Sequence, residues 1–342
     1  MIPEVPCDHL LGHSDPVVRS SLSSDSTGER PVPPVRPAFD RSQPDTVCAP
    51  TTHPGARVIH KVVTRSAYGI AVRDDGLACF TEPYQGGVGI TSAQSRTALW
   101  FIPTGDIPTE VDFSPDGATA YVTNQYSQNV GVVDVAGAQQ VATISLSPAN
   151  PFVVRVSPDG AQLFISTSGT TVYVADTQTR AITAAVEVGD PPNAFAVSPD
   201  GRTIYVSPFE GGTVSEIDIF RHAVLRTFQV GGVPQDMAVA RNGKRLYVAN
   251  QDGNLNEIDL TTGRQETPIP LGWTAFGIGV TPDDAQAYVS LVYEGLVRIL
   301  DLQSRRCAKT LQVGGYPRRI AFSRQGGIAA VANEAGFVTF VR

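Results

Sequence analysis

The chain has 342 residues, of which 42% are hydrophobic and 17% are charged, so it can bury the core of a large folded domain. Its formal charge of −7 offers no basic surface for nucleic acid or for an anionic membrane. No apolar run approaches the roughly 18 residues of a membrane-spanning helix. The sequence therefore predicts a folded protein with no nucleic-acid partner and no membrane span.

Residues 1–54 differ in composition from the rest of the chain. They contain Pro31, Pro33 and Pro34, serine pairs at 20–21 and 23–24, and no hydrophobic period of two or 3.6. This composition is typical of a disordered tail. The segment lacks the basic start and the apolar stretch of roughly 7–15 residues that mark a secretory signal. We therefore expect a cytoplasmic location, with export as the alternative if the true start site lies elsewhere.

Residues 57–64 (RVIHKVVT) are the first β-rich segment. Their pattern matches residues 224–230 and 308–313, and all three segments lead directly into another β-rich run. We therefore expect residues 57–64 to form a strand of the same kind as these two.

A unit that recurs through the chain is clearest at residues 111–124 (VDFSPDGATAYVTN). Pro115 presets φ, Asp116 bonds to its own backbone and Gly117 adopts a positive φ, which together predict a tight turn between two short strands. Residues 130–134 and 141–146 supply a third and a fourth strand. The unit is therefore expected to be one four-stranded antiparallel sheet.

The turn position recurs seven times, with steps of 41 to 43 residues. It falls at Gly76, Gly117, Gly160, Gly201, Gly243, Asp284 and Gly326. A period near forty with four strands in each period is typical of a β-propeller. The fold class is therefore predicted to be all-β, a seven-bladed β-propeller that spans residues 55–342.

The last unit ends before its fourth strand. It has strands at residues 320–322, 328–332 and 337–341, and then the sequence stops. Residues 57–64 are the spare strand, so we predict that they add to the edge of blade 7 and close the ring. A closed ring needs no partner subunit to cover its edges, and a monomer is expected.

The sequence resembles the YVTN-repeat β-propeller family over residues 57–342. The resemblance rests on the SPDG turns at 114–117, 157–160 and 198–201, and on the strand endings YVTN at 121–124 and YVAN at 247–250. The turns at 241–243 and 323–326 depart from this pattern. The resemblance implies the fold, whereas propellers of this shape include binding proteins, lactone-hydrolysing enzymes and antibiotic lyases.

Candidate site residues come from aligning the seven linkers that lead into each first strand. These linkers meet at the top face of a propeller, around the mouth of the central channel. One ring of aligned positions carries Glu110, Asp236 and Arg319, predicted as catalytic residues. The adjacent ring, together with one linker tryptophan, supplies the predicted ligand-binding residues Tyr68, Phe152, Asn193, Gln235, Phe276, Arg318 and Trp273. Aromatic walls with few charges suit an organic ligand that bears a carboxylate.

Other interpretations of these residues remain open. Glu110, Asp236 and Arg319 can simply neutralise one another in a wet channel. No cofactor is expected, although Glu110 and Asp236 can instead hold a divalent cation, as in gluconolactonase-like propellers. The antibiotic lyases use a histidine at the channel mouth, and none of the five histidines is predicted to lie there.

Two classes of function follow. The first is a binding or scaffold propeller that takes a small organic molecule or a protein partner at its top face. The second is a lyase, isomerase or lactone hydrolase acting on a small carboxylate or lactone, with Glu110 or Asp236 as general base and Arg319 as clamp. The fold alone does not decide between them.

Overall fold

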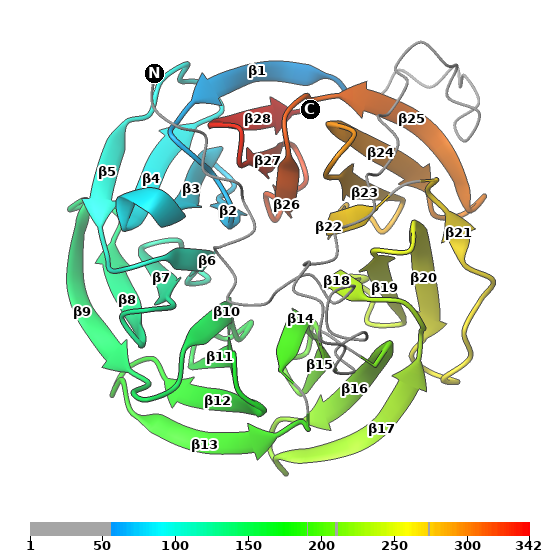
Figure 1. Ribbon diagram of the computed structural model, residues 1–342, viewed down its shortest axis with the longest axis horizontal. Coiled ribbons are helices and arrows are strands. Elements are labelled where there is room, and N and C mark those ends of the chain that lie inside the picture. Colours follow the sequence, from blue (N-terminus) through cyan, green and yellow to red (C-terminus); the bar gives the residue numbers. More distant parts are fainter. Residues whose placement is uncertain (1–55, 190, 209–210, 273) are drawn as a thin grey trace, which may run out of the picture. The chain divides into compact units, whose positions relative to one another are not determined.

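The computed structural model describes residues 56–189, 191–208, 211–272 and 274–342. These residues form seven four-stranded antiparallel sheets arranged in a ring around a central channel (Figure 1). The predicted seven-bladed propeller is confirmed. The tail predicted for residues 1–54 lies outside the described residues.

The strands of blades 1 to 4 follow one another along the chain, with the first strand of each blade innermost. Blade 1 consists of β2 (Ile70–Val72), β3 (Leu77–Glu82), β4 (Gly87–Ser92) and β5 (Trp100–Pro103). Blade 2 consists of β6 (Pro108–Phe113), β7 (Thr119–Asn124), β8 (Asn129–Asp134) and β9 (Gln139–Ser145). Blade 3 consists of β10 (Pro151–Val156), β11 (Gln162–Thr167), β12 (Thr171–Asp176) and β13 (Ile182–Glu187). Blade 4 consists of β14 (Pro192–Val197), β15 (Thr203–Pro208), β16 (Thr213–Asp218) and β17 (Ala223–Gln229).

Blades 5 and 6 repeat the pattern, and blade 7 draws its strands from both ends of the described chain. Blade 5 consists of β18 (Pro234–Val239), β19 (Arg245–Asn250), β20 (Asn254–Asp259) and β21 (Ile269–Pro270). Blade 6 consists of β22 (Ala275–Val280), β23 (Gln286–Leu291), β24 (Leu296–Asp301) and β25 (Arg306–Gln312). Blade 7 consists of β26 (Pro317–Phe322), β27 (Ala329–Asn333), β28 (Phe337–Val341) and β1 (Val58–Val63).

The ring closes as predicted, because β1 pairs antiparallel with β28. Arg57 and Arg342 also exchange two backbone hydrogen bonds, of 2.7 and 3.0 Å. Val62 of β1 is fully buried in the core between blades 7 and 1, where Phe80 and Phe340 also pack. The N-terminal strand therefore supplies both ladder hydrogen bonds and core to the last blade.

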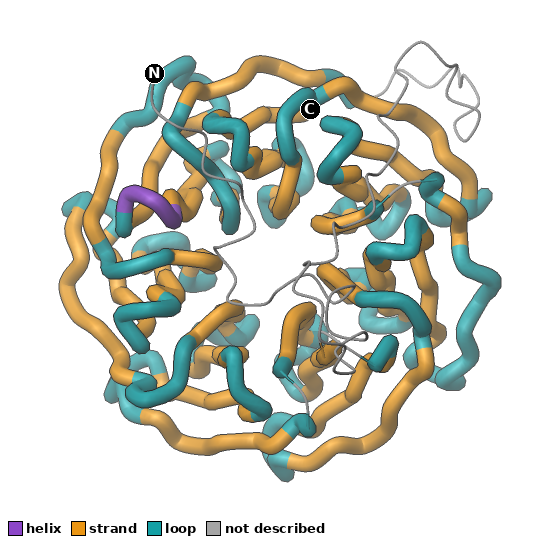
Figure 2. Tube along the Cα trace, viewed as in Figure 1, coloured by secondary structure: helices purple, strands orange, loops and turns teal. Residues whose placement is uncertain are grey.

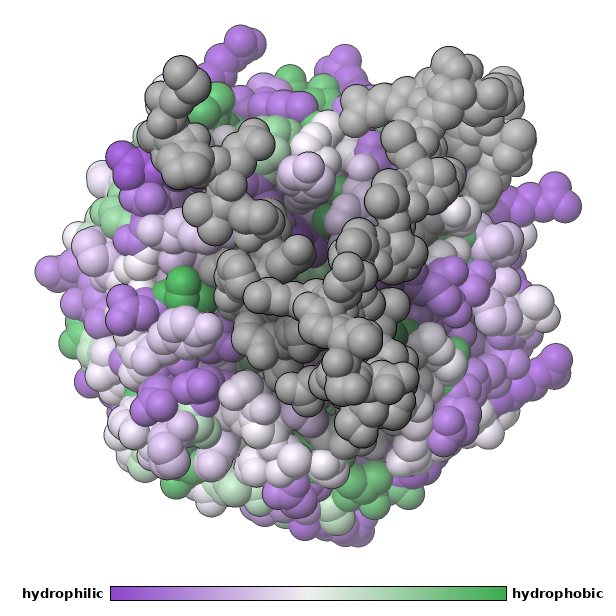
Figure 3. Space-filling view, viewed as in Figure 1, coloured by the Kyte–Doolittle hydropathy of each residue, from purple (hydrophilic) through white to green (hydrophobic). Residues whose placement is uncertain are grey.

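Strands and loops make up nearly all of the described chain (Figure 2). The only helical segment among the described residues is the 3-10 turn η3 (Pro83–Gln85). No helix in this part of the chain has the length and apolar character to cross a membrane. On the visible part of the face in Figure 3, hydrophilic and hydrophobic residues are intermixed around the rim.

The repeated turn adopts the conformation that its sequence predicts. Gly117 has φ of 70°, and Asp284, which replaces glycine in blade 6, has φ of 56°. The Asp116 carboxylate accepts a hydrogen bond from the Ala118 backbone N–H. These first-to-second strand turns define the bottom face of the ring, and the linkers into each first strand define the top face.

Candidate functional site

The channel is lined by the first strands, and an irregularity in most of them positions the predicted site residues. In blade 2 the pairing register of β6 shifts between Pro108 and Val111, which takes Glu110 out of the regular ladder. The Glu110 backbone N–H donates instead to Thr123 Oγ1 at 2.9 Å. The same hydroxyl lies 3.1 Å from the Phe152 carbonyl of the next blade. The threonine of the YVTN motif therefore supports the irregular strand and ties neighbouring blades together.

Two glycines make room for the charged members of this ring. A Cβ on Gly69 would lie 2.6 Å from the Thr109 carbonyl oxygen and 2.9 Å from Glu110 Oε1. A Cβ on Gly277 would lie 2.1 Å from the Arg318 carbonyl oxygen. The blades that precede Glu110 and Arg319 in the ring therefore approach them too closely for any larger residue.

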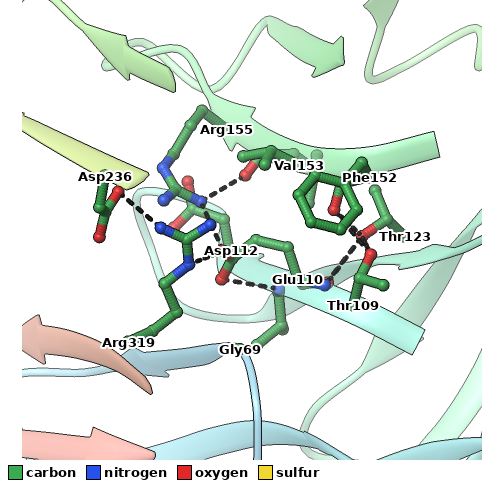
Figure 4. A network of polar contacts seen from close by, with 12 residues as sticks. Gly69, Thr109, Glu110, Asp112, Thr123, Phe152, Val153, Arg155, Asp236 and Arg319 are labelled. Carbon is green, nitrogen blue, oxygen red and sulfur yellow. Dashed lines mark hydrogen bonds and ion pairs between the residues drawn. The ribbon is translucent and has the colours of Figure 1, made fainter. Parts of the chain in front are cut away.

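The structure brings the three predicted catalytic residues together (Figure 4). Arg319 lies between the two carboxylates, with Nη1 at 2.9 Å from Asp236 Oδ1 and Nε at 3.3 Å from Glu110 Oε2. Arg319 Nη1 also donates to the Gln235 carbonyl at 3.0 Å. All three side chains are buried, with residue exposures of 2% to 4%. A single guanidinium from blade 7 thus links blades 2 and 5 across the channel.

Burial and charge have opposite effects on Glu110. Burial raises the pKa of its carboxyl group, and Asp236 adds to this, while Arg155 and Arg319 oppose the shift. Burial works against the charge of Arg319, but Asp236 and Glu110 outweigh it and raise the pKa of the guanidinium. Arg319 is therefore a permanent cation, whereas Glu110 holds its proton to a higher pH than an exposed glutamate.

The predicted aromatic wall is occupied by the chain's own arginine. Tyr68 and Phe276 meet edge to face, with ring centroids 6.1 Å apart. The Arg318 guanidinium lies 4.5 Å from the Phe276 centroid and 5.7 Å from that of Tyr68. Arg318 Nη2 also contacts Glu334 Oε2 at 2.7 Å. Arg318 is thus engaged by an ion pair and two aromatic rings.

The other predicted ligand-binding residues do not join the aromatic cluster around Arg318. Asn193 Nδ2 donates to the Pro234 carbonyl at 2.8 Å, and Gln235 Nε2 donates to Gln251 Oε1 at 3.2 Å. Phe152 is half-buried beside the core between blades 3 and 4. Trp273 lies outside the described residues. Asn193 and Gln235 are therefore held by contacts within the ring.

A cavity of about 300 Å³ lies in the channel next to the charged ring. Glu110, Asp236 and Arg319 contribute to its lining, and the rest comes from residues further along the first strands, towards the bottom face. Those residues include Ala71, Asp112, Arg155, Ala321 and Arg324. A second cavity of about 280 Å³ lies among the bottom-face turns and shares Val72, Phe113 and Arg324 with the first. The cavity in the channel therefore adjoins the bottom face of the ring.

Asp112, Arg155 and Arg324 were not among the predicted site residues. The sequence does contain a signal for Asp112 and Arg155. In each first strand, the residue two positions after the aligned ring of Glu110, Asp236 and Arg319 forms a second ring. Its members are Ala71, Asp112, Arg155, Ala196, Ala238, Gly279 and Ala321. Five members of this second ring are small and leave the channel open there. The other two, Asp112 and Arg155, lie on the adjacent blades 2 and 3.

Asp112 and Arg155 are both held in place by backbone groups. The Asp112 carboxylate accepts from the backbone N–H groups of Phe113 and Val156, both at 2.9 Å. Arg155 Nη1 donates to the Val154 carbonyl at 2.8 Å and lies 3.8 Å from Glu110 Oε2. Burial raises the pKa of Asp112, with Arg155 and Arg324 opposing the shift.

Within the described ranges, no group of three or more histidine, cysteine, aspartate or glutamate residues is arranged to hold a metal ion. The two carboxylates considered for a divalent cation, Glu110 and Asp236, both contact Arg319. A guanidinium thus occupies the position between them.

Comparison with known proteins supports the fold. No family model matches the chain. The seven-bladed beta-propeller protein Rv1057 of Mycobacterium tuberculosis is 31% identical over 125 residues, which is 34% of this chain and 32% of that protein. The chain therefore matches about a third of the length of this curated relative.

A solved structure extends the likeness to most of the ring. Kuenenia stuttgartiensis hydrazine synthase superposes with a TM-score of 0.73 at 19% identity, covering 81% of this chain and 95% of that one. At this identity the similarity shows the fold alone.

Proposed function

We propose that this protein is a binding propeller of the YVTN-repeat type that holds a small organic ligand in its central channel. The observation that carries the proposal is the cavity of about 300 Å³ beside the buried Glu110–Arg319–Asp236 cluster. This volume is at the lower end of the range typical of small-molecule sites, and the lining combines charged side chains with apolar ones.

The contacts within the charged ring favour binding over catalysis. Arg319 already neutralises Glu110 and Asp236, and its own N–H groups point to these carboxylates and to a backbone carbonyl. A clamp for a reacting group needs free donors, and a general base needs an accessible lone pair. Arg319 Nη1 is engaged by Asp236 and the Gln235 carbonyl, and Arg319 Nε faces Glu110 Oε2 at 3.3 Å, so the ring serves better as a rigid wall of the cavity.

One observation favours the alternative, an enzyme acting on a small carboxylate or lactone. Burial raises the pKa of Glu110, and Glu110 lines the cavity. Active sites often hold a carboxyl group with a raised pKa as general acid or base. Glu110 would then take a proton from a bound substrate while Arg319 stabilised the developing negative charge.

A thermal-shift screen tests the binding proposal. Small carboxylates, lactones, amides and divalent cations are added to the wild-type protein, and a ligand that binds the native state raises the melting temperature. The Ala321→Leu variant fills the cavity from its wall, and Ala181→Leu is the control because Ala181 is exposed outside it. We expect a shift that Ala321→Leu abolishes and Ala181→Leu retains.

The same screen separates the two functions. A compound that binds is incubated with wild type and with Glu110→Gln, and its turnover is followed by mass spectrometry. If the compound is turned over by wild type and not by Glu110→Gln, the protein is an enzyme, and the proposal of a non-catalytic binding propeller is rejected. If no compound shifts the melting temperature, the small-ligand proposal fails, and capture of a protein partner becomes the next experiment.

A further inference from the structure

The cavity has unused hydrogen-bond donors near its bottom-face side. Among the described contacts, Arg155 uses Nη1 towards the Val154 carbonyl and towards Glu110. The Arg324 side chain, which lies on the bottom-face turn of blade 7, makes no hydrogen bond or ion pair with the residues that the structure describes. A guanidinium carries five N–H donors, so both arginines retain capacity for a ligand.

The carboxylates in the same cavity already face donors or cations. Both Asp112 oxygens accept backbone N–H groups, and Glu110 and Asp236 form ion pairs with Arg319. Glu110 Oε2 accepts no hydrogen bond within the described part of the chain, whereas Arg155 and Arg324 together offer several donors. Such a site selects a ligand group rich in acceptors, and a planar guanidinium matches a carboxylate with two parallel hydrogen bonds.

Blades 1 and 7 contribute small and apolar groups to the cavity lining, beside Arg319 and Arg324. Ala71, Ala321 and Phe322 contribute to it, and these residues belong to blades 1 and 7. A ligand with a charged end and a compact apolar body would place its body against these side chains. The shared lining with the bottom-face cavity gives it a route that passes Arg324.

We propose that the channel cavity binds a small organic carboxylate that enters from the bottom face, with Arg155 and Arg324 contacting the carboxylate and the alanine wall covering the apolar body. This inference rests on the proposed function, since it names the ligand class and the entry side of the same cavity. It moves the ligand away from the top-face aromatic residues, where Arg318 already fills the space.

The test pairs each carboxylate with its neutral amide. Benzoate and benzamide, succinate and succinamide, and inorganic phosphate are titrated into the full-length protein by calorimetry. The variants are Arg155→Gln and Arg324→Gln. The matched control is Arg306→Gln, because Arg306 is exposed and lines neither cavity.

We expect at least one carboxylate to bind more tightly than its amide. Arg155→Gln and Arg324→Gln should each weaken that carboxylate by about 10- to 100-fold, as expected for one charged hydrogen-bonded contact. The Arg306→Gln variant should bind as wild type does. Arg324 is exposed, so its variant is informative even if loss of the more buried Arg155 prevents folding.

Four results would overturn the inference. An amide that binds as tightly as its acid, or unchanged carboxylate affinity in both arginine variants, would reject the ligand class while the proposed function stands. Binding of phosphate without any carboxylate would reject it in favour of an inorganic anion. A complete absence of binding would remove the inference, whereas the proposed function fails only if the wider thermal-shift screen also finds no ligand.

Discussion

Arg319 illustrates how one side chain can organise the centre of a propeller. Its guanidinium contacts Asp236 and Glu110 from two other blades, and all three groups are buried. Removing one member of a buried ion cluster leaves uncompensated charge, which costs about 3–5 kcal/mol. We expect Arg319→Met to lower the free energy of unfolding by that amount in urea titrations.

The control for this prediction is Arg306→Met, because Arg306 is exposed and its loss should change the free energy of unfolding by no more than about 0.5 kcal/mol. The triple variant Arg319→Met, Glu110→Gln, Asp236→Asn should recover much of the lost stability, since it removes the two unpaired charges as well. Equal stability of Arg319→Met and wild type would contradict a structural role for the cluster.

A second prediction at the residue scale concerns how Glu110 makes the stability of the protein depend on pH. Its pKa in the folded state is raised above the unfolded value of about 4.3. The folded protein therefore binds the proton more tightly, so Glu110 favours folding below pH about 4 and loses this contribution as pH rises through its folded pKa.

The Glu110→Gln variant stays neutral at every pH. We expect its stability relative to wild type to increase as pH rises from about 4, and then to level off. Urea midpoints of both proteins across this range measure the effect. A difference that does not change with pH would show that the Glu110 pKa is not raised.

At the scale of the element, the irregular first strands position the residues of the candidate site. These strands place one residue per blade at the channel, and glycine is required where the next blade comes close, as at Gly277. We expect Gly277→Ala to destabilise the protein by about 2 kcal/mol or more, because its Cβ would lie 2.1 Å from the Arg318 carbonyl oxygen.

Gly327→Ala is the matched control, because nothing lies within 4 Å of a Cβ at that position. That change should be neutral or stabilising by up to about 1 kcal/mol, since alanine restricts the unfolded chain. The melting temperatures of the two variants, measured side by side, test whether the close approach at Gly277 requires glycine. Similar values for both would mean that blades 6 and 7 can separate slightly at no cost.

At the scale of the whole ring, closure depends on β1. Its ladder with β28 and the burial of Val62 complete blade 7. A variant lacking residues 1–50 should melt within a few degrees of the full chain, whereas one lacking residues 1–65 should lose cooperative unfolding and aggregate through the bare edge of β28. Circular dichroism and size-exclusion chromatography measure these outcomes, and an intact monomeric ring without β1 would refute the closure.

The sequence predicts the ring and the alignment of its charged residues because both follow from a period of about forty residues. The structure adds what no period contains. Arg319 reaches two carboxylates on other blades, and Arg318 turns to Glu334 and fills the aromatic wall. Side-chain reach across a channel depends on strand tilt and on the register shifts, neither of which is visible in the sequence.

The pairing of β1 with β28 also fixes an order of events when the chain is made. Blades 1 to 6 each consist of consecutive strands and can assemble as soon as they leave the ribosome, whereas blade 7 must wait until β28 has been synthesised. Until then the core that contains Val62 and Phe80 lacks the residues that β27 and β28 contribute to it, such as Phe340. The nascent ring therefore exposes one open seam for most of its synthesis, which is the stage at which a chaperone would recognise it.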